Sequence, residues 1–110
     1  METTSFLIEY HSDTPELTDQ LKAKIERRIE KLSRGNTDLT SASIAVTTNS
    51  GDSQPREYRM RILLTSKLAD VAVTEKGESL PTVVTEALGA LERQVREQRD
   101  RRRESKKRQR

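Results

Sequence analysis

The apolar residues of this chain repeat with two different periods, and the order of these periods constrains the fold more than any other feature of the sequence. A period of two residues, typical of a half-buried strand, is clearest in residues 5–11 and 57–64, and strands are also expected at residues 42–48 and 69–75. A period of three to four residues, typical of an amphipathic helix, follows the first strand and the last one. The sequence therefore predicts the element order β-α-β-β-β-α.

Local signals predict where the first helix begins and ends. Asp13 or Thr14 is expected to cap it before Pro15, and Gly35 with Asn36 provides a left-handed stop. Its apolar positions recur every three or four residues and comprise Leu17, Leu21, Ile25, Ile29 and Leu32.

The second helix is expected to follow a Ser79 cap, with Pro81 in the first turn, where proline is tolerated. Its apolar face comprises Val83, Val84, Ala87, Leu88, Leu91 and Val95. These elements predict an α+β fold in which two helices pack on one face of a four-stranded mixed sheet, as in double-stranded-RNA-binding domains. The first two strands should pair in parallel through a crossover, and the later three should meander. We expect one domain over residues 1–100 and a disordered basic tail over residues 101–110.

The composition excludes most classes of enzyme. The chain has no cysteine, which rules out a disulfide framework, a zinc knuckle and a thiol nucleophile. Its single histidine, His11, lies at the end of a predicted strand, and the four glycines form no phosphate-binding loop. We therefore expect no enzyme activity, cofactor, metal or small-molecule substrate. No apolar run resembles a leader or a membrane span, so a cytoplasmic protein without a membrane partner is expected.

Basic residues are concentrated at the C-terminal end and on one side of each predicted helix. Residues 91–110 contain ten lysines and arginines against four acidic residues, whereas residues 1–90 contain 11 against 14. On a helical wheel, the first helix carries a basic stripe that comprises Lys24, Arg27, Lys31 and Arg34, with Arg28 at its flank. Arg93, Arg96 and Arg99 also point away from the apolar face of the second helix. A solvated charged face is the plain alternative, but two adjacent basic rows favour a surface that binds a polyanion.

The few aromatic residues indicate how such a surface would recognise its partner. Phe6, Tyr10 and Tyr58 occupy predicted core positions, so a base-stacking platform is not expected. Recognition of folded RNA by shape and phosphate contacts fits better. Two alternatives stay open. One is a general structured-RNA-binding module, and the other is a protein-interaction domain that dimerises through the open sheet face, where Leu63 lies beside Arg61. We expect a monomer, with a dimer as the alternative.

Two segments of the chain are similar to those of a known family. The segments LTDQLKAKIERRIEKLSR and VAVTEKGESLPTVVTEALGALERQVREQ resemble the short ribosome hibernation promoting factors and the ribosome-associated translation inhibitor, also called sigma-factor modulation proteins. The resemblance implies binding to the small ribosomal subunit and its ribosomal RNA, in the channel used by messenger and transfer RNA. Members of that family suppress translation there in stationary phase or stress.

The resemblance also implies individual contact residues. The basic residues of the family's first helix match Arg28, Lys31 and Arg34, and those of its second helix match Arg93. A lysine found before the second helix in some members matches Lys76. From the helical wheel and the resemblance together, the expected RNA contacts are Lys24, Arg27, Arg28, Lys31, Arg34, Lys76, Arg93, Arg96 and Arg99.

Overall fold

The six elements follow one another in the predicted order. The computed structural model describes residues 7–36, 38–49, 56–67 and 69–108, with side chains through residue 100. The elements are β1 (Leu7–Ser12), α1 (Asp19–Gly35), β2 (Leu39–Asn49), β3 (Glu57–Ser66), β4 (Val71–Gly77) and α2 (Leu80–Arg108).

The four strands form one mixed sheet in the order β1-β2-β3-β4. β1 runs parallel to β2, with Tyr10 opposite Ile44. β3 runs antiparallel to both of its neighbours, and Ile62 lies opposite Ile44 on β2 and opposite Val73 on β4. The predicted parallel crossover and the meander are thereby confirmed.

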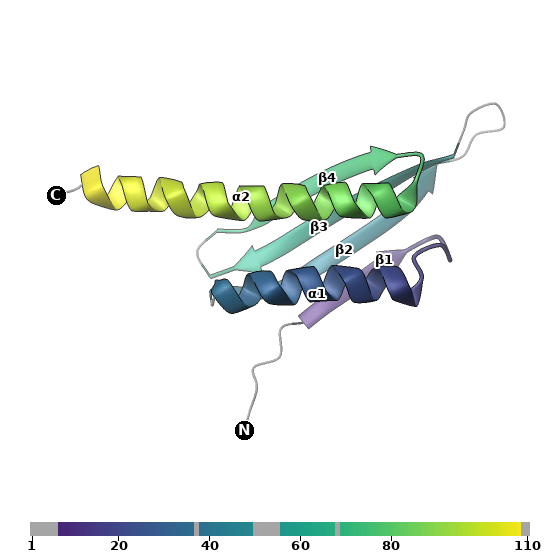
Figure 1. Ribbon diagram of the computed structural model, residues 1–110, viewed down its shortest axis with the longest axis horizontal. Coiled ribbons are helices and arrows are strands. Elements are labelled where there is room, and N and C mark those ends of the chain that lie inside the picture. Colours follow the sequence, from purple (N-terminus) through teal and green to yellow (C-terminus); the bar gives the residue numbers. More distant parts are fainter. Residues whose placement is uncertain (1–6, 37, 50–55, 68, 109–110) are drawn as a thin grey trace, which may run out of the picture.

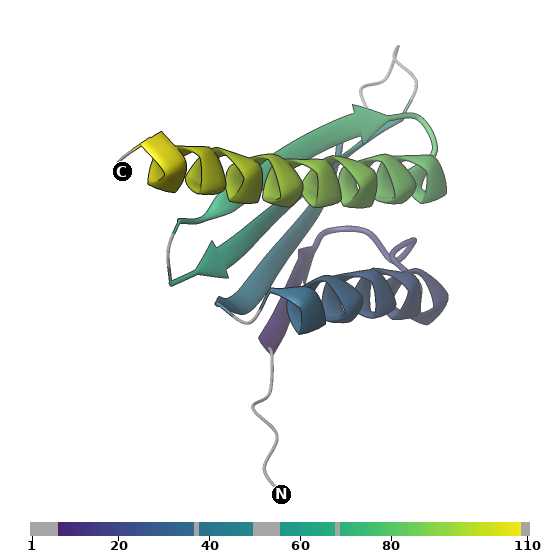
Figure 2. The same ribbon diagram turned by 60° about the vertical axis from the view of Figure 1, so that its left-hand side comes forward.

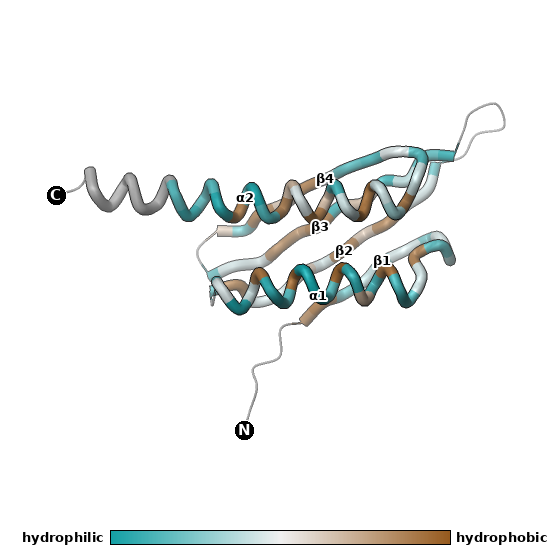
Figure 3. Tube along the Cα trace, in the orientation of Figure 1, coloured by the Kyte–Doolittle hydropathy of each residue, from teal (hydrophilic) through white to brown (hydrophobic). Residues whose placement is uncertain are grey.

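Both helices cover the same face of the sheet, and the core lies between the two layers (Figures 1 and 2). Ile29 of α1, Ile62 of β3 and Leu88 of α2 are at most 1% exposed. Apolar and polar colours alternate along both helices in Figure 3, because only one side of each helix reaches the sheet. Replacing such a core side chain with alanine typically costs about 2–5 kcal/mol. None of the described elements covers the other face of the sheet, which we call the uncovered face.

The first helix begins later than the sequence predicts. Its cap is Thr18, whose Oγ1 accepts a hydrogen bond from the backbone N–H of Leu21 at 3.3 Å, and not Asp13 or Thr14. Asp13 is engaged elsewhere, since its carboxylate accepts a hydrogen bond from the backbone N–H of Thr48 at 3.0 Å. The predicted cap is therefore wrong, because a tertiary contact uses the side chain that a local reading assigns to the helix.

The end of α1 lies where it was predicted but has a different geometry. Asn36 follows the last helical residue, Gly35, with φ of −140°, which is not a left-handed conformation. Its side-chain amide instead donates a hydrogen bond to the backbone carbonyl of Leu32 at 2.9 Å. The helix therefore stops through a side-chain hydrogen bond and not through a left-handed turn.

Helix α2 continues without a break to Arg108. The backbone of residues 101–108 is thus helical where a disordered tail was expected, and arginine, lysine and glutamate are good helix formers. The division of domains at residue 100 stays a prediction. Within the described ranges, neither helix combines the length and the apolar character that crossing a bilayer requires.

Candidate nucleic-acid interface

Helices α1 and α2 lie side by side and run in the same direction, so successive turns of one face successive turns of the other (Figures 1 and 2). Near the start of both helices, Lys24 Nζ donates a hydrogen bond to Thr85 Oγ1 at 2.7 Å. One turn later, Arg28 of α1 meets Glu92 of α2. The basic stripe of α1 therefore borders α2.

Arg28 and Glu92 form a bidentate ion pair between the helices. Arg28 Nε donates to Glu92 Oε2 and Arg28 Nη2 donates to Glu92 Oε1, both at 2.8 Å. Hydrogen bonding to Arg28 lowers the pKa of the Glu92 carboxyl, and the same contact raises the pKa of the Arg28 guanidinium. The side chains are 35% and 33% exposed, so solvent screens the attraction. The pair links the two helices at the middle of their contact.

A groove opens between the second half of α1 and the middle of α2. We call it the interhelix groove, and its volume is about 480 Å³. It is lined by Arg28, Lys31, Leu32, Gly35, Asn36, Glu92, Val95, Arg96, Arg99 and Asp100. Leu32 and Val95 supply the apolar part of the lining, whereas Lys31 and Arg96 are exposed and bring one positive charge from each helix.

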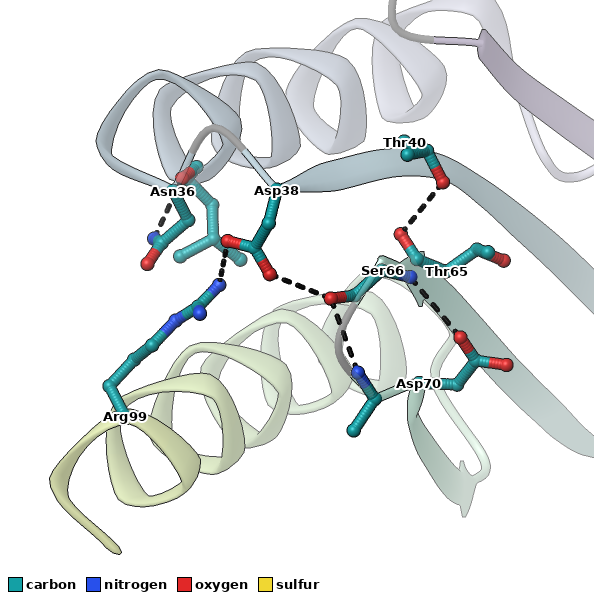
Figure 4. Close-up of polar contacts among 9 residues, drawn as sticks. Asn36, Asp38, Thr40, Thr65, Ser66, Asp70 and Arg99 are labelled. Carbon is teal, nitrogen blue, oxygen red and sulfur yellow. Dashed lines mark hydrogen bonds and ion pairs between the residues drawn. The ribbon is translucent and has the colours of Figure 1, made fainter. Parts of the chain in front are cut away.

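The groove ends at a second ion pair, between Arg99 of α2 and Asp38 beside the start of β2 (Figure 4). Arg99 Nη2 lies 2.5 Å from Asp38 Oδ1, and the side chains are only 20% and 19% exposed. The other carboxylate oxygen, Oδ2, accepts a hydrogen bond from Ser66 Oγ at 2.7 Å. The backbone N–H of Ser66 in turn donates to Asp70 Oδ1 at 3.1 Å. These contacts tie α2 to the ends of β2 and β3.

The surroundings of this second pair show that Arg99 has a structural role. Burial raises the pKa of the Asp38 carboxyl, but hydrogen bonds from Ser66 and Arg99 outweigh that effect and hold the pKa below its usual range. Arg99 Nε is buried and has no hydrogen-bond partner among the residues that the structure describes. The Arg99 guanidinium is therefore turned inward and is not presented to a ligand outside the groove.

Five other basic residues of the two helices point outward. We call them the basic rim, and they are Arg27, Lys31, Arg34, Arg93 and Arg96. All five are exposed, and none belongs to an ion pair in the described part of the chain. Glu26 of α1 points instead toward β1, where it accepts a hydrogen bond from Tyr10 Oη at 2.9 Å. Charge on α1 is thus sorted by direction as well as by sequence.

The structure therefore divides the nine predicted contact residues into three groups. Five form the basic rim. Lys24, Arg28 and Arg99 instead hold protein groups, namely Thr85, Glu92 and Asp38.

The ninth predicted contact, Lys76, does not lie with the other eight. Along β4 the side chains of Val71 and Val73 are buried against the helices, whereas Ala72, Thr74 and Lys76 are exposed. Because side chains alternate along a strand, Lys76 points from the uncovered face of the sheet. The alternation of side chains along β4, counted from the buried Val71, could have placed Lys76 on the face of the sheet that is turned away from the helices.

The sequence analysis missed Asp38 and Glu92, the two carboxylates that form ion pairs with Arg99 and Arg28. Each acid lies more than 60 positions from its arginine, so no local pattern connects them. The one available signal is that Glu92 directly precedes a predominantly basic run that begins at Arg93.

Aromatic side chains are not displayed for stacking in the described part of the chain. Tyr58 is buried at 7% exposure, and its hydroxyl donates to Glu16. Tyr10 is half-buried, and burial, followed by its hydrogen bond to Glu26, raises the pKa of its hydroxyl. Phe6 lies outside the described residues. His11 is exposed, and its Nε2 lies 4.0 Å from Glu9 Oε1.

Solved structures share this fold. A ribosomal subunit interface protein from Coxiella burnetii superposes with a TM-score of 0.72 over 86% of this chain and 99% of its own, at 9% sequence identity. The N-terminal domain of Protein Y from Thermus thermophilus superposes with a TM-score of 0.60 over 83% of this chain and 96% of its own, at 21% identity. At these identities the likeness shows the fold.

Comparison with sequences supplies the family. No curated protein matches the chain. A family model does match, and it covers residues 8–103, which include β1 from its second residue, the other three strands, all of α1 and most of α2. The chain therefore belongs to the family of the Sigma 54 modulation protein / S30EA ribosomal protein.

Proposed function

We propose that this protein binds the small ribosomal subunit through its basic rim and represses translation by occupying the region where messenger and transfer RNA are decoded. The observation that carries the proposal is the rim itself, five exposed cations without an ion-pair partner in the described ranges. Membership of a family described as a ribosomal protein supports the choice of the ribosome as partner.

The rim suits phosphate contacts on a folded RNA. Its residues project from two helices that the Arg28–Glu92 pair joins, and the Arg99–Asp38 pair ties α2 to the end of the sheet, so the backbone positions of the rim residues keep their spacing when RNA binds. A preorganised backbone loses little freedom on binding. Without exposed aromatic side chains on these helices, recognition would depend on the shape and phosphates of the RNA and not on stacked bases.

The mechanism is competitive occupancy. A protein seated in the decoding region excludes messenger and transfer RNA from the same space, so no chemical step on the ribosome is needed. If the rim neutralises five phosphates, affinity should fall by about two to three orders of magnitude between 50 and 200 mM salt, by the counterion release typical of nucleic acids.

Sedimentation with purified small subunits tests the proposal. Lys31→Gln with Arg96→Gln should weaken binding and reduce the slope of log affinity against log salt by about two. The matched control is Arg56→Gln with Lys67→Gln, which removes the same charge from exposed positions outside the helices and should leave the slope close to that of the natural protein.

Competition then tests the location on the subunit. Subunits preloaded with messenger RNA and initiator transfer RNA should bind the protein less well than empty subunits. Equal binding to both would place the protein elsewhere on the ribosome. Binding to protein-free RNA without binding to subunits would favour the general RNA-binding module.

A further inference from the structure

The uncovered face of the sheet carries a basic cluster that is separate from the basic rim. Met60 and Ile62 of β3 are fully buried under the helices, so Arg59 and Arg61, which alternate with them, point to the other side. Arg59 lies directly opposite Lys76 of β4. We call Arg59, Arg61 and Lys76 the sheet-face cluster, and all three are exposed.

The cluster is unfavourable for folding by itself. Like charges at directly opposed positions of an antiparallel pair repel, and Arg59 and Lys76 occupy such positions. The Cα atoms of Arg59 and Arg61 are about 7 Å apart along the strand, which places three cations within one small area. In the portion of the chain that the structure describes, no ion pair involves any of the three. A polyanion lying across β3 and β4 would remove the repulsion.

The surroundings of the cluster are small and rich in hydroxyl groups. Ala45 lies opposite Arg61, Thr47 opposite Arg59, and Thr74 opposite Arg61 on the other side. A hollow of about 260 Å³ adjoins the cluster and is lined by Thr47, Thr48, Asn49, Glu57 and Arg59. Hydroxyl and amide groups donate hydrogen bonds to phosphate oxygens, and low side chains let a strand of nucleic acid approach the sheet closely. The Glu57 carboxylate at the edge of the hollow is the one acid among these residues, and it is outnumbered by the three cations of the cluster.

We infer that the sheet-face cluster binds the sugar-phosphate backbone of a second RNA segment, on the opposite side of the molecule from the basic rim. The inference goes beyond the proposed function, and it rests on that function only in taking ribosomal RNA as the RNA at hand. The protein would then lie between two RNA segments, with its helices against one and its sheet against the other.

An RNA partner fits this face better than a protein partner. Protein interfaces concentrate aromatic and large apolar side chains at their centre, whereas interfaces with nucleic acids are more polar and more basic. Among the described residues, the one large hydrophobic side chain that is strongly exposed is Leu7, at 57%, on the far edge strand β1. Near the cluster, Leu63 lies beside Arg61 on this face but is half-buried.

A charge-removal experiment measures the contribution of the cluster. The triple variant Arg59→Gln, Arg61→Gln and Lys76→Gln should bind small subunits at least tenfold more weakly at 100 mM salt, with a salt slope reduced by about three. Its melting temperature should be equal or higher, because the repulsion across β3 and β4 is gone. The triple control Lys22→Gln, Arg56→Gln and Lys67→Gln removes the same charge elsewhere, including the Lys22 cation over the Tyr10 ring and the Arg56 partner of Glu16, and it should change affinity less than threefold. Equal losses in the two triples would overturn the inference.

Photo-crosslinking separates this inference from the proposed function. A benzoylphenylalanine at Thr74 reports on the sheet face, and one at Glu30, an exposed position of α1 near the basic rim, reports on the helix face. We expect both probes to crosslink ribosomal RNA at different nucleotides.

Each other outcome has a defined meaning. RNA crosslinks from Glu30 alone would overturn the inference and leave the proposed function standing. RNA crosslinks from Thr74 alone would support the inference and overturn the proposed binding through the basic rim. A crosslink from Thr74 to a ribosomal protein or to a second copy of this chain would overturn the inference in favour of a protein interface. Absence of RNA crosslinks from both probes would overturn both.

Discussion

Arg96 and Arg99 lie one turn apart on α2, yet their surroundings differ, because Arg99 lies at the closed end of the interhelix groove and Arg96 at its open part. Arg99 is buried against Asp38, whereas Arg96 is exposed and belongs to no ion pair in the described residues. The difference lies in what the neighbouring elements bring. At the closed end, Asp38, which follows α1, presents a carboxylate to Arg99, whereas α1 itself presents Lys31 to the open part of the groove. A basic stripe on a helix is therefore available to a ligand only where no acid from another element reaches it.

The largest loss of stability is expected from a substitution at the closed end of the interhelix groove. Asp38→Ala removes the partner of Arg99 and the acceptor of the Ser66 hydroxyl, and it leaves a mostly buried guanidinium without a counterion. We expect the free energy of unfolding to fall by about 2–3 kcal/mol. Urea denaturation measures this loss. The control is Asp70→Ala, since Asp70 is exposed and accepts one backbone hydrogen bond from Ser66, and it should cost less than about 1 kcal/mol. Equal costs for the two variants would contradict a special role of the Arg99 pair.

A smaller effect is expected where the groove is open. Glu92→Gln removes the ion pair with Arg28 at a position about a third exposed, so the loss of stability should be only about 0.5–1 kcal/mol. The same change frees Arg28 and removes a negative charge from between Lys31 and Arg96. Binding to small subunits should therefore tighten although the protein is less stable. Glu86→Gln is the control, because Glu86 is exposed on α2 and is in no ion pair within the described part. If both variants gain affinity equally, only net charge matters.

The smallest expected effect is a pH dependence of the stability difference between the natural protein and Glu92→Gln. The pKa of Glu92 is lower in the folded protein than the value of about 4.3 expected when unfolded, so its ion pair stabilises the fold above that pH. This stabilisation is lost as the pH falls through the folded pKa. The free energies of unfolding of the natural protein and of Glu92→Gln should thus differ at pH 7 and converge below about pH 4. Thermal melts of both proteins across this range measure the convergence, and a constant difference would rule out ionisation of Glu92 as its source.

The sequence predicted the fold well because the signals for strands and helices are local. Alternation in β3 and the three-to-four spacing in α1 place Ile62 and Ile29 in the core without knowledge of the rest of the chain. The cap of α1 was predicted wrongly for the opposite reason, since Asp13 makes a contact with β2 that no local pattern contains.

The candidate site was predicted in part. The wheel correctly placed the rim residues on the outer side of two neighbouring helices, because direction around a helix follows from spacing. It could not separate Arg96 from Arg99, since that distinction depends on where packing of the core places Asp38. Lys76 was grouped by its position before α2, although strand alternation puts it on the other face of the sheet.

The edge position of β1 also bears on how the chain folds. β2, β3 and β4 are joined to one another without an intervening helix. β1 pairs only with β2, and the connection between these two strands contains all of α1. Closing a longer loop costs more chain entropy before any contact rewards it. We therefore expect the antiparallel hairpins to form first and β1 with α1 to dock last, so that completion of the two-helix surface is the final event of folding.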